Sequence, residues 1–252
     1  MKKVIRKIIL KILYPIIKWL GFVRPHQIHT YDKNNLLLTL IRILKENKFS
    51  PNLIIDIGAN HGTWSRVWKE HFPQTSFILV EPQSWLKPSF DDLLDNHTIY
   101  LPIGAGSTNG SFTFTINSDR DDSSTFSLSA DEALARGYKQ VEIPVKTLNT
   151  IVQENGNIIP DIVKIDAEGI DIDVLDGASN LFGKTEIFLV EASINSTFKQ
   201  TELTAVINYM DNKGYRVFEI TDINRPFSNS VLWLIELAFV RKGGYFDQLK
   251  WY

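Results

Sequence analysis

The sequence predicts an α/β fold built on a doubly wound, mostly parallel β-sheet. Short apolar segments of strand length alternate with helical patterns over most of the chain, and strands that alternate with helices form parallel pairs through right-handed crossovers. The last two apolar segments have no helical pattern between them, so we expect them to pair antiparallel. With 252 residues, 44% of them hydrophobic, the chain can bury a substantial core.

The first half of the chain supplies three of the expected strands. The dipeptide at residues 50–51, Ser-Pro, ends an N-terminal helical region, because proline disfavours helical backbone in the residue before it. After it, apolar runs of strand length are separated by amphipathic stretches typical of helices. The expected strands cover residues 53–58, 76–81 and 98–103, and the expected helices cover residues 35–45, 63–71 and 88–94.

The pattern changes between Gly106 and Leu148. Apolar and polar residues alternate at 112–116 and 141–145, which is typical of strands with one side facing solvent. We expect a hairpin-like insertion here that covers a pocket. The α/β pattern then returns, with strands expected at residues 161–166, 186–191, 215–220 and 236–241 and helices at 171–182 and 202–213.

The first 24 residues form a basic amphipathic segment. They contain seven Lys or Arg residues and no acid, and in a helix the charged and apolar side chains would separate onto opposite halves. Lysines interrupt the apolar run too often for a spanning helix, whereas a basic amphipathic helix suits an anionic membrane surface. The alternative is a helix packed on the body of the protein. We therefore divide the chain into an N-terminal helical segment, residues 1–48, and a main domain, residues 49–252.

Charge and cysteine content exclude several classes of function. Residues 1–48 carry eleven basic residues against Asp32 and Glu46, a net charge of +9, so the rest of the chain carries −11 of the total of −2. An acidic body repels a phosphate backbone, which argues against a nucleic-acid substrate. Without cysteine there is no disulfide and no zinc–thiolate site. We expect a cytoplasmic protein, peripheral on the inner face of the membrane if the N-terminal helix binds there.

A glycine-containing turn, residues 56–62 (DIGANHG), follows the first strand of the main domain. Glycines in such a turn let the backbone approach a ligand closely. The glycine spacing differs from the G-x-G-x-x-G of dinucleotide sites and from the G-x-x-x-x-G-K-[ST] of phosphate loops. The turn alone therefore indicates a ligand site without identifying the ligand.

An acid ends the next expected strand. Glu81, followed by Pro82, lies 25 residues after Asp56, and an acid at such a strand tip can accept both ribose hydroxyls of a nucleoside. Taken alone, Glu81 would be interpreted as a solvated residue at a strand end. Together with the glycine turn, it predicts a nucleoside site at the carboxyl ends of the strands.

The strand at 161–166 carries Lys164 in an otherwise apolar run. Strands buried on both faces are nearly all apolar, so a buried ammonium group needs a carboxylate partner or a lowered pKa. Asp166 and Glu168 lie on the same side of this strand, and Glu191 ends the strand expected beside it. Charges gathered at strand ends indicate a functional site. The alternative is an ion-pair network that fixes the register of the strands.

These segments together resemble the FkbM family of methyltransferases. The resemblance rests on DIGANHGTWS, VEP, EIPVKTLNTIV, DIVKIDAEGIDIDVLDGA and FLVEAS, and it covers roughly residues 50–242. It implies a Rossmann-like class I methyltransferase fold and S-adenosylmethionine as the methyl donor. It also implies an oxygen acceptor, commonly a hydroxyl of a sugar, a glycan or a secondary metabolite.

The resemblance also implies roles for individual residues. Asp166 and Glu168 would face the methyl-transfer position, and Glu81, with Pro82 beside it, would bind the ribose hydroxyls. The remaining candidates are Asp56, Gly58, Ala59, Asn60 and Gly62 for the donor, and Ser123, Ser124 and Glu191 for the acceptor.

The mechanism that this suggests is in-line displacement at the sulfonium methyl group. The acceptor oxygen must lie close to the methyl carbon and collinear with the breaking C–S bond. A carboxylate that takes the hydroxyl proton makes this oxygen a better nucleophile. Asp166 or Glu168 is the candidate base, and Lys164 is expected to adjust its pKa through a nearby positive charge.

Three alternatives stay open at this stage. Asp166, Glu168 and Glu191 are oxygen ligands of the kind that bind Mg²⁺, but the neighbouring lysine already neutralises such acids, so we expect no metal. A non-catalytic or membrane-tethered binding protein can retain the fold, although such a protein would be expected to lose some site residues. NAD-dependent oxidoreduction is disfavoured by the glycine spacing. We expect the acceptor to be a small molecule or a saccharide.

Overall fold

A seven-stranded sheet, in the order β10-β11-β9-β8-β1-β2-β3, forms the centre of the protein. The computed structural model describes residues 35–116, 124–125, 128–194, 202–226, 228 and 230–249. Within this sheet every pair is parallel except those that β11 forms with β9 and β10. The predicted doubly wound sheet with an antiparallel last strand is confirmed. Its strands are β1 (Leu53–Ile57), β2 (Ser76–Val80), β3 (Thr98–Leu101), β8 (Ile162–Ile165), β9 (Ile187–Ser193), β10 (Tyr215–Asn224) and β11 (Leu234–Arg241).

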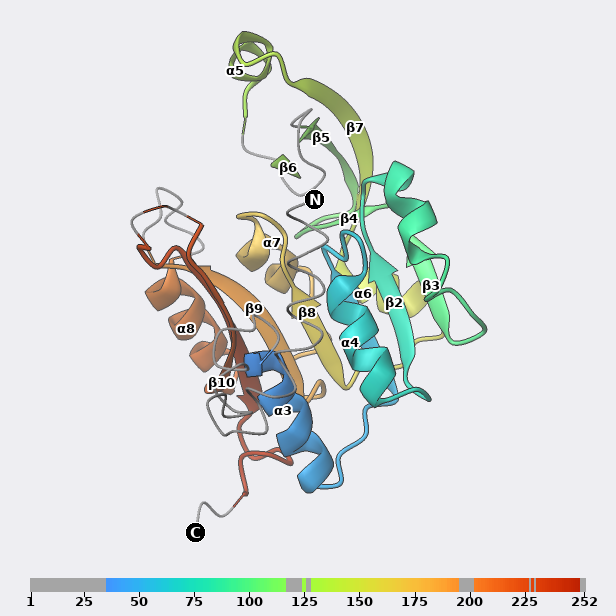
Figure 1. Cartoon of the computed structure of the whole chain (residues 1–252), viewed down its shortest axis with the longest axis vertical. Coiled ribbons are helices and arrows are strands. Elements are labelled where there is room, and N and C mark those ends of the chain that lie inside the picture. The colour runs from blue at the N-terminus through green and yellow to red at the C-terminus, as the bar shows by residue number, and fades with distance from the viewer. Residues whose placement is uncertain are drawn as a thin grey trace, which may run out of the picture.

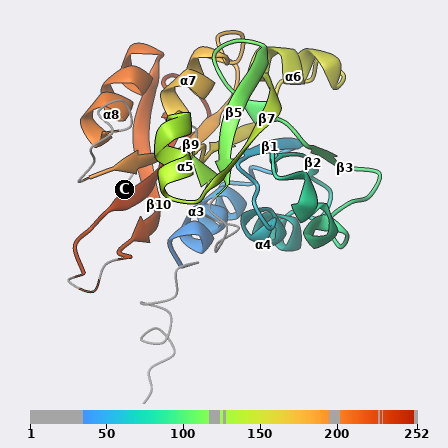
Figure 2. The same ribbon diagram turned by 90° about the horizontal axis from the view of Figure 1, so that it is seen from above.

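Helices cover both faces of this sheet (Figure 2). Leu40 and Trp68 belong to the hydrophobic core on one face, whereas Val174 and Met210 belong to the core on the other. The three-layer arrangement follows from the amphipathic helices, which bury their apolar sides against the sheet. The first face carries α3 (Asn35–Glu46) and α4 (Thr63–His71), and the second carries α6 (Leu148–Glu154), α7 (Asp171–Asp176) and α8 (Leu203–Asn212).

The predicted helix at residues 35–45 is present as α3, and its apolar side chains are buried in the core. The basic segment at residues 1–24 lies outside the described residues, and the division of the chain at residue 48 stays a prediction. Within the part of the chain that the structure describes, no helix is long and apolar enough to cross a membrane.

The predicted insertion forms a second, four-stranded sheet in the order β4-β7-β5-β6. Phe114, Ile143 and Val145 form its small core. The expected alternation holds in β7, whereas in β5 Phe112 is exposed and Thr115 is buried. In Figure 1 the insertion projects beyond the central sheet at the upper end of the molecule. Its elements are β4 (Gly104–Ala105), β5 (Gly110–Ile116), β6 (Ser124–Thr125), α5 (Ala130–Ala135) and β7 (Lys139–Lys146).

The prediction of a helix at residues 88–94 is wrong. A 3₁₀ helix, η1 (Ser84–Phe90), lies there instead and begins one turn earlier. Leu86 and Phe90 are both buried in the core, and this packing fixes the position of the turn. Pro88 has no N–H group, so it cannot take part in the i to i−4 hydrogen bonding of an α-helix.

The helix predicted at residues 171–182 is shorter than expected, because α7 ends at Asp176. A Cβ atom on Gly177 would lie 2.2 Å from the carbonyl oxygen of Gly106, so this glycine is where the helix end packs against the base of the insertion. The chain then continues in turns, with Ala178 N donating to Leu175 O at 3.0 Å.

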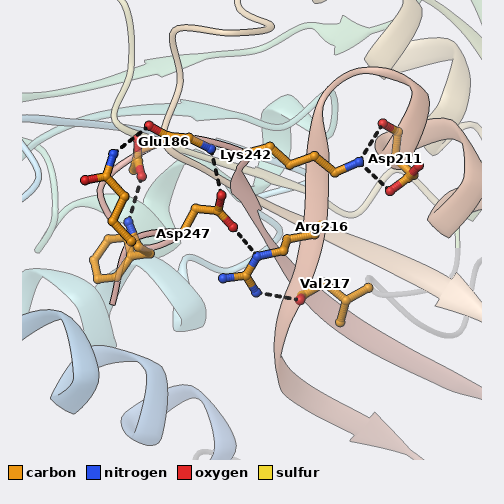
Figure 3. Close-up of polar contacts among 9 residues, drawn as sticks. Glu186, Asp211, Arg216, Val217, Lys242 and Asp247 are labelled. Carbon is orange, nitrogen blue, oxygen red and sulfur yellow. Dashed lines mark hydrogen bonds and ion pairs between the residues drawn. The ribbon is translucent and has the colours of Figure 1, made fainter. Parts of the chain in front are cut away.

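Ion pairs hold the sheet together at the end where β9 and β10 begin. Arg241 Nη2 lies 3.1 Å from Glu186 Oε2, and Arg216 forms an ion pair with Asp247. Figure 3 shows Arg216 between Asp247 and the carbonyl oxygen of Val217. These contacts tie β11 to the residue before β9 and β10 to the segment after β11, away from the carboxyl ends of the parallel strands.

Candidate functional site

The carboxyl ends of the parallel strands surround a pocket of about 450 Å³. Phe114 of the insertion lines it as well, so the insertion contributes to the pocket as expected. The predicted site residues that line this pocket are Gly58, Ala59, Asn60, Glu81, Pro82, Lys164, Asp166, Glu168 and Glu191.

Four predicted residues remain to be accounted for. Asp56 is fully buried and Gly62 caps α4, so both support the pocket without lining it. Ser123 lies outside the described residues. Ser124 is in β6, where its backbone pairs with that of Ile116 in β5.

The two glycines of the turn after β1 are required by the packing of the protein itself. Gly58 has a φ of 74°, and a Cβ atom there would lie 1.9 Å from the carbonyl oxygen of Asp166. Gly62 has a φ of 73°, and a Cβ atom there would lie 2.7 Å from Leu93 Cδ1. Gly58 therefore allows the turn after β1 to touch the loop after β8, which brings the two halves of the pocket together.

The Glu81 carboxylate is held at the end of β2 by two backbone N–H groups. Its Oε2 accepts a hydrogen bond from Asn60 N and its Oε1 accepts one from Gln83 N, both at 2.9 Å. Burial raises the pKa of Glu81, and the two N–H donors oppose this shift. A carboxylate offers about four acceptor positions, so Glu81 can still accept hydrogen bonds from a ligand in the pocket.

Lys164 connects the buried centre of the sheet to the pocket. Its Nζ lies 3.1 Å from Asp166 Oδ2 and 3.4 Å from Asp56 Oδ1, and Ser65 Oγ donates to Asp56 Oδ2 at 2.6 Å. Burial alone would lower the pKa of Lys164, but the carboxylates of Asp166, Asp56 and Glu236 outweigh burial and raise it. The ammonium group therefore stays charged. The prediction that Lys164 has a carboxylate partner is confirmed, since both Asp166 and Asp56 form ion pairs with it.

A buried acid shapes the loop after β8. Asp171 Oδ1 accepts a hydrogen bond from Ala167 N at 2.9 Å, and within this loop Glu168 and Gly169 have φ values of 52° and 101°. Burial raises the pKa of Asp171 to about 7. The sequence prediction missed Asp171. The sequence signal that could have identified it is an acid in the first turn of a helix, four residues after the residue whose N–H group donates to it.

Two acids lie directly opposite each other where β9 pairs with β11. Glu191 is the cross-strand partner of Glu236, and both line the pocket. Thr221 Oγ1 donates to Glu236 Oε1 at 2.6 Å, and burial raises the pKa of Glu236 to about 7. Burial raises the pKa of Glu191 as well, and the nearby carboxylates of Asp166, Asp171 and Glu168 raise it further. The sequence prediction missed Glu236, although an acid in the apolar run of β11 was a usable signal.

The pocket is strongly acidic and therefore suits a positively charged group. Among the described residues that line it there are six carboxylates and one lysine, and opposite charges attract strongly where water is partly excluded. Over the described ranges, no group of three or more His, Cys, Asp or Glu residues could hold a metal ion.

Similar solved structures include a putative O-methyltransferase from Klebsiella pneumoniae, at 10% identity and a TM-score of 0.46, covering 87% of this chain and 81% of that chain. Another is TrmK from M. capricolum in complex with S-adenosyl-homocysteine, at 11% identity and a TM-score of 0.44, covering 83% and 71%. No curated protein matches this chain.

A family model gives the decisive comparison. The model described as the methyltransferase FkbM domain matches residues 56–217, which is more than half of the chain and includes the turn after β1, Glu81 and the loop after β8. The sheet order has the doubly wound arrangement expected of a Rossmann-like class I methyltransferase. The chain therefore belongs to the FkbM methyltransferase family, and it is an S-adenosylmethionine-dependent methyltransferase.

Proposed function

We propose that this enzyme methylates a hydroxyl group of a sugar, a glycan or a secondary metabolite. The observation that carries the proposal is the common pocket of Glu81 on one side and Asp166, Glu168 and Glu191 on the other. A carboxylate beside the transfer position can accept the proton that a hydroxyl must lose. The acidic body of the chain supports a small-molecule or saccharide acceptor over nucleic acid.

The donor half of the pocket is formed by the turn after β1 and the end of β2. S-adenosylmethionine supplies a methyl group that is activated by the positive charge of its sulfonium. We assign the ribose hydroxyls to Glu81, with Pro82 beside it, and the rest of the donor to backbone groups of Gly58, Ala59 and Asn60. Asp56 and Gly62 act from behind the pocket surface, Asp56 through its ion pair with Lys164 and Gly62 through the start of α4.

The acceptor half is formed by the loop after β8 and the ends of β9, β10 and β11. Lys164 forms an ion pair with Asp166, with an Nζ to Oδ2 distance of 3.1 Å. Asp166 and Glu168 are proposed to face the transfer position, where they orient the hydroxyl and accept its hydrogen bond. Ser123 and Ser124 stay predicted acceptor-binding residues.

The proposed chemistry is tested by transfer of a labelled methyl group. The enzyme is incubated with S-adenosylmethionine and with panels of methyl glycosides, phenols and amines, and the methylated atom is identified in each product. Products methylated on oxygen support the proposal, whereas products methylated only on nitrogen or carbon contradict it. If donor binding is tight and no acceptor in any panel reacts, a non-catalytic binding protein becomes the better reading.

The role of the β8 loop is tested with Asp166→Asn and Glu168→Gln, and the exposed Glu70 of α4 provides Glu70→Gln as the control. Donor affinity is measured separately, so that a loss of turnover is not confused with a loss of binding. We expect lower turnover in at least one of the two loop variants and unchanged turnover in the control. Unchanged turnover in both loop variants would remove these two residues from the acceptor half.

We also propose that residues 1–24 bind an anionic membrane surface on the cytoplasmic side. Their seven basic residues, the absence of acids and the amphipathic pattern support this. A lipid-linked saccharide would then be within reach as an acceptor. Flotation with phosphatidylserine vesicles tests the proposal, because a chain that lacks residues 1–24 should bind them less tightly than the full chain. Equal binding of the two proteins contradicts it.

A further inference from the structure

We propose that Glu191 is the residue that takes the proton from the acceptor hydroxyl, and that Glu236 is a positioning residue for it. This inference rests on the proposed O-methylation and narrows it to one proton acceptor. It follows from three properties of Glu191: its place in the sheet, its freedom from other polar contacts, and its directly opposed partner.

Glu191 occupies the boundary between the core and the pocket. Of the seven residues of β9 it is the one that is not fully buried, and it lines the pocket. It follows Val190, which pairs with Ile165, the last residue of β8. Glu191 therefore lies level with Asp166, and its side chain reaches the same space as that of Asp166 from the neighbouring strand.

The three carboxylates that surround the proposed transfer position differ in their polar contacts. Asp166 is held by Lys164 at 3.1 Å, so its carboxylate already has a cationic partner. Glu168 is exposed to solvent. Among the described residues, none donates a hydrogen bond to the Glu191 carboxylate or pairs with it within 4 Å.

The charges around Glu191 favour its protonated form. The acidic groups near it are Asp166 and Glu168 in the loop after β8, Asp171 on α7 and, directly opposite it, Glu236 on β11, and Lys164 has the opposing effect. Burial and these carboxylates raise the pKa of Glu191 well above its ordinary value. A general base works best when its pKa lies near the working pH, and the rise in the pKa of Glu191 moves it toward that pH.

Glu236 restricts the position of the Glu191 carboxylate. The two residues are directly opposite in an antiparallel pair, so their side chains lie on the same face of the sheet and close together. Thr221 donates to Glu236 at 2.6 Å, which holds the Glu236 side chain in one position. Glu236, an acid held in place directly opposite, therefore keeps the Glu191 carboxylate on the pocket side of the sheet.

The proposed step balances as follows. The acceptor oxygen forms a bond to the methyl carbon while the bond from that carbon to sulfur breaks and its electron pair stays on sulfur. The hydroxyl proton moves to a carboxylate oxygen of Glu191, which becomes a neutral carboxylic acid. Glu191 then releases this proton to water after the products leave.

The test compares the pH dependence of kcat for the full-length enzyme and its variants, with methyl glycosides and phenols as acceptors. Glu191→Gln should lower kcat about 100-fold or more, leave the affinity for S-adenosylhomocysteine within about 3-fold, and abolish the acidic limb of the profile. Glu191→Asp should restore part of the activity together with the limb. Glu70→Gln, on the exposed side of α4, is the matched control and should behave as the wild type.

Glu236→Gln supplies a second reading, because Gln can still accept the hydrogen bond from Thr221. Removing the opposed negative charge should lower the apparent pKa of Glu191 and move the acidic limb to lower pH, whereas a purely structural role would leave the limb in place. If the wild type methylates hydroxyls and Glu191→Gln keeps both its kcat and its acidic limb, the inference is overturned and the proposed function stands. If the wild type methylates only nitrogen or carbon, both are overturned.

Discussion

The Nζ atom of Lys164 lies 3.4 Å from Oδ1 of Asp56, and both residues are buried where the central strands β8 and β1 pair with each other. The same ammonium group contacts Asp166 at the pocket surface. One lysine thus links the core of the sheet to the proposed site. Lys164 therefore has both of the roles considered from the sequence: its ion pairs stabilise the sheet, and they also position a residue of the proposed site.

Loss of this lysine should destabilise the fold. Lys164→Met leaves Asp56 buried without its cationic partner, and breaking a buried pair by removing one member costs about 3–5 kcal/mol. We expect the free energy of unfolding, measured by urea denaturation, to fall by about that amount. The exposed pair of Lys146 and Glu154 gives the control, since Lys146→Met should change the free energy by less than about 1 kcal/mol. Equal effects of the two substitutions would contradict this role of Lys164.

Gly58→Ala should damage both the fold and donor binding. The substitution places a Cβ atom against the carbonyl oxygen of Asp166 at a φ of 74°, so the turn after β1 and the loop after β8 must move apart. We expect a loss of about 3 kcal/mol in unfolding free energy and weaker binding of S-adenosylhomocysteine.

The Gly183→Ala variant introduces the same backbone strain as Gly58→Ala but no clash, so it separates these two effects. Gly183 has a similar φ of 76°, but a Cβ atom there meets nothing within 4 Å. This variant should lose about 1 kcal/mol and keep its affinity for S-adenosylhomocysteine. A Gly58→Ala variant that is no worse than Gly183→Ala would show that the close approach to Asp166 is unimportant.

The buried Asp171 should make stability depend on pH between about 4 and 7. Its pKa is raised from an ordinary value of 3.8 to about 7 in the folded protein. The folded state therefore holds the proton more tightly than the unfolded state, and this contribution is favourable at low pH and is lost as the pH rises through 7. Asp171→Asn does not titrate, so it should gain stability relative to the wild type, on the order of 3 kcal/mol, between pH 4.5 and 7.5.

The measurement is a pair of urea titrations at these two pH values for the wild type and for Asp171→Asn. Other titrating groups are common to both proteins and cancel in the difference. A difference in unfolding free energy that stays constant between the two pH values would mean that Asp171 is not buried as the structure has it.

The central sheet could be predicted from the sequence because its signals are local. Apolar runs and amphipathic stretches reveal strands and helices one element at a time, and a lysine in a buried strand such as Lys164 is conspicuous in the sequence itself. The acid at the end of β2, Glu81, and the glycines of the turn after β1 are equally local features.

The features that escaped prediction depend on contacts between distant segments. The end of α7 is set by the approach of Gly177 to Gly106, which lies in another element. The pairing of Glu191 with Glu236 requires the register of two antiparallel strands, and nothing in either segment alone specifies it. Asp171 was overlooked because its partner is a backbone N–H group, that of Ala167, and an acid in the first turn of a helix does not by itself show which N–H group it binds.

Titration of S-adenosylhomocysteine into the wild type and into Glu81→Gln, followed by calorimetry, tests the central claim most directly. A charged acceptor contributes about 1.5–3 kcal/mol per hydrogen bond, so the substitution should weaken binding about 10-fold or more, while Glu70→Gln should bind as the wild type does. The account predicts saturable binding at one site in the wild type and this loss in Glu81→Gln. No binding to the wild type, or equal affinity in Glu81→Gln, would contradict it.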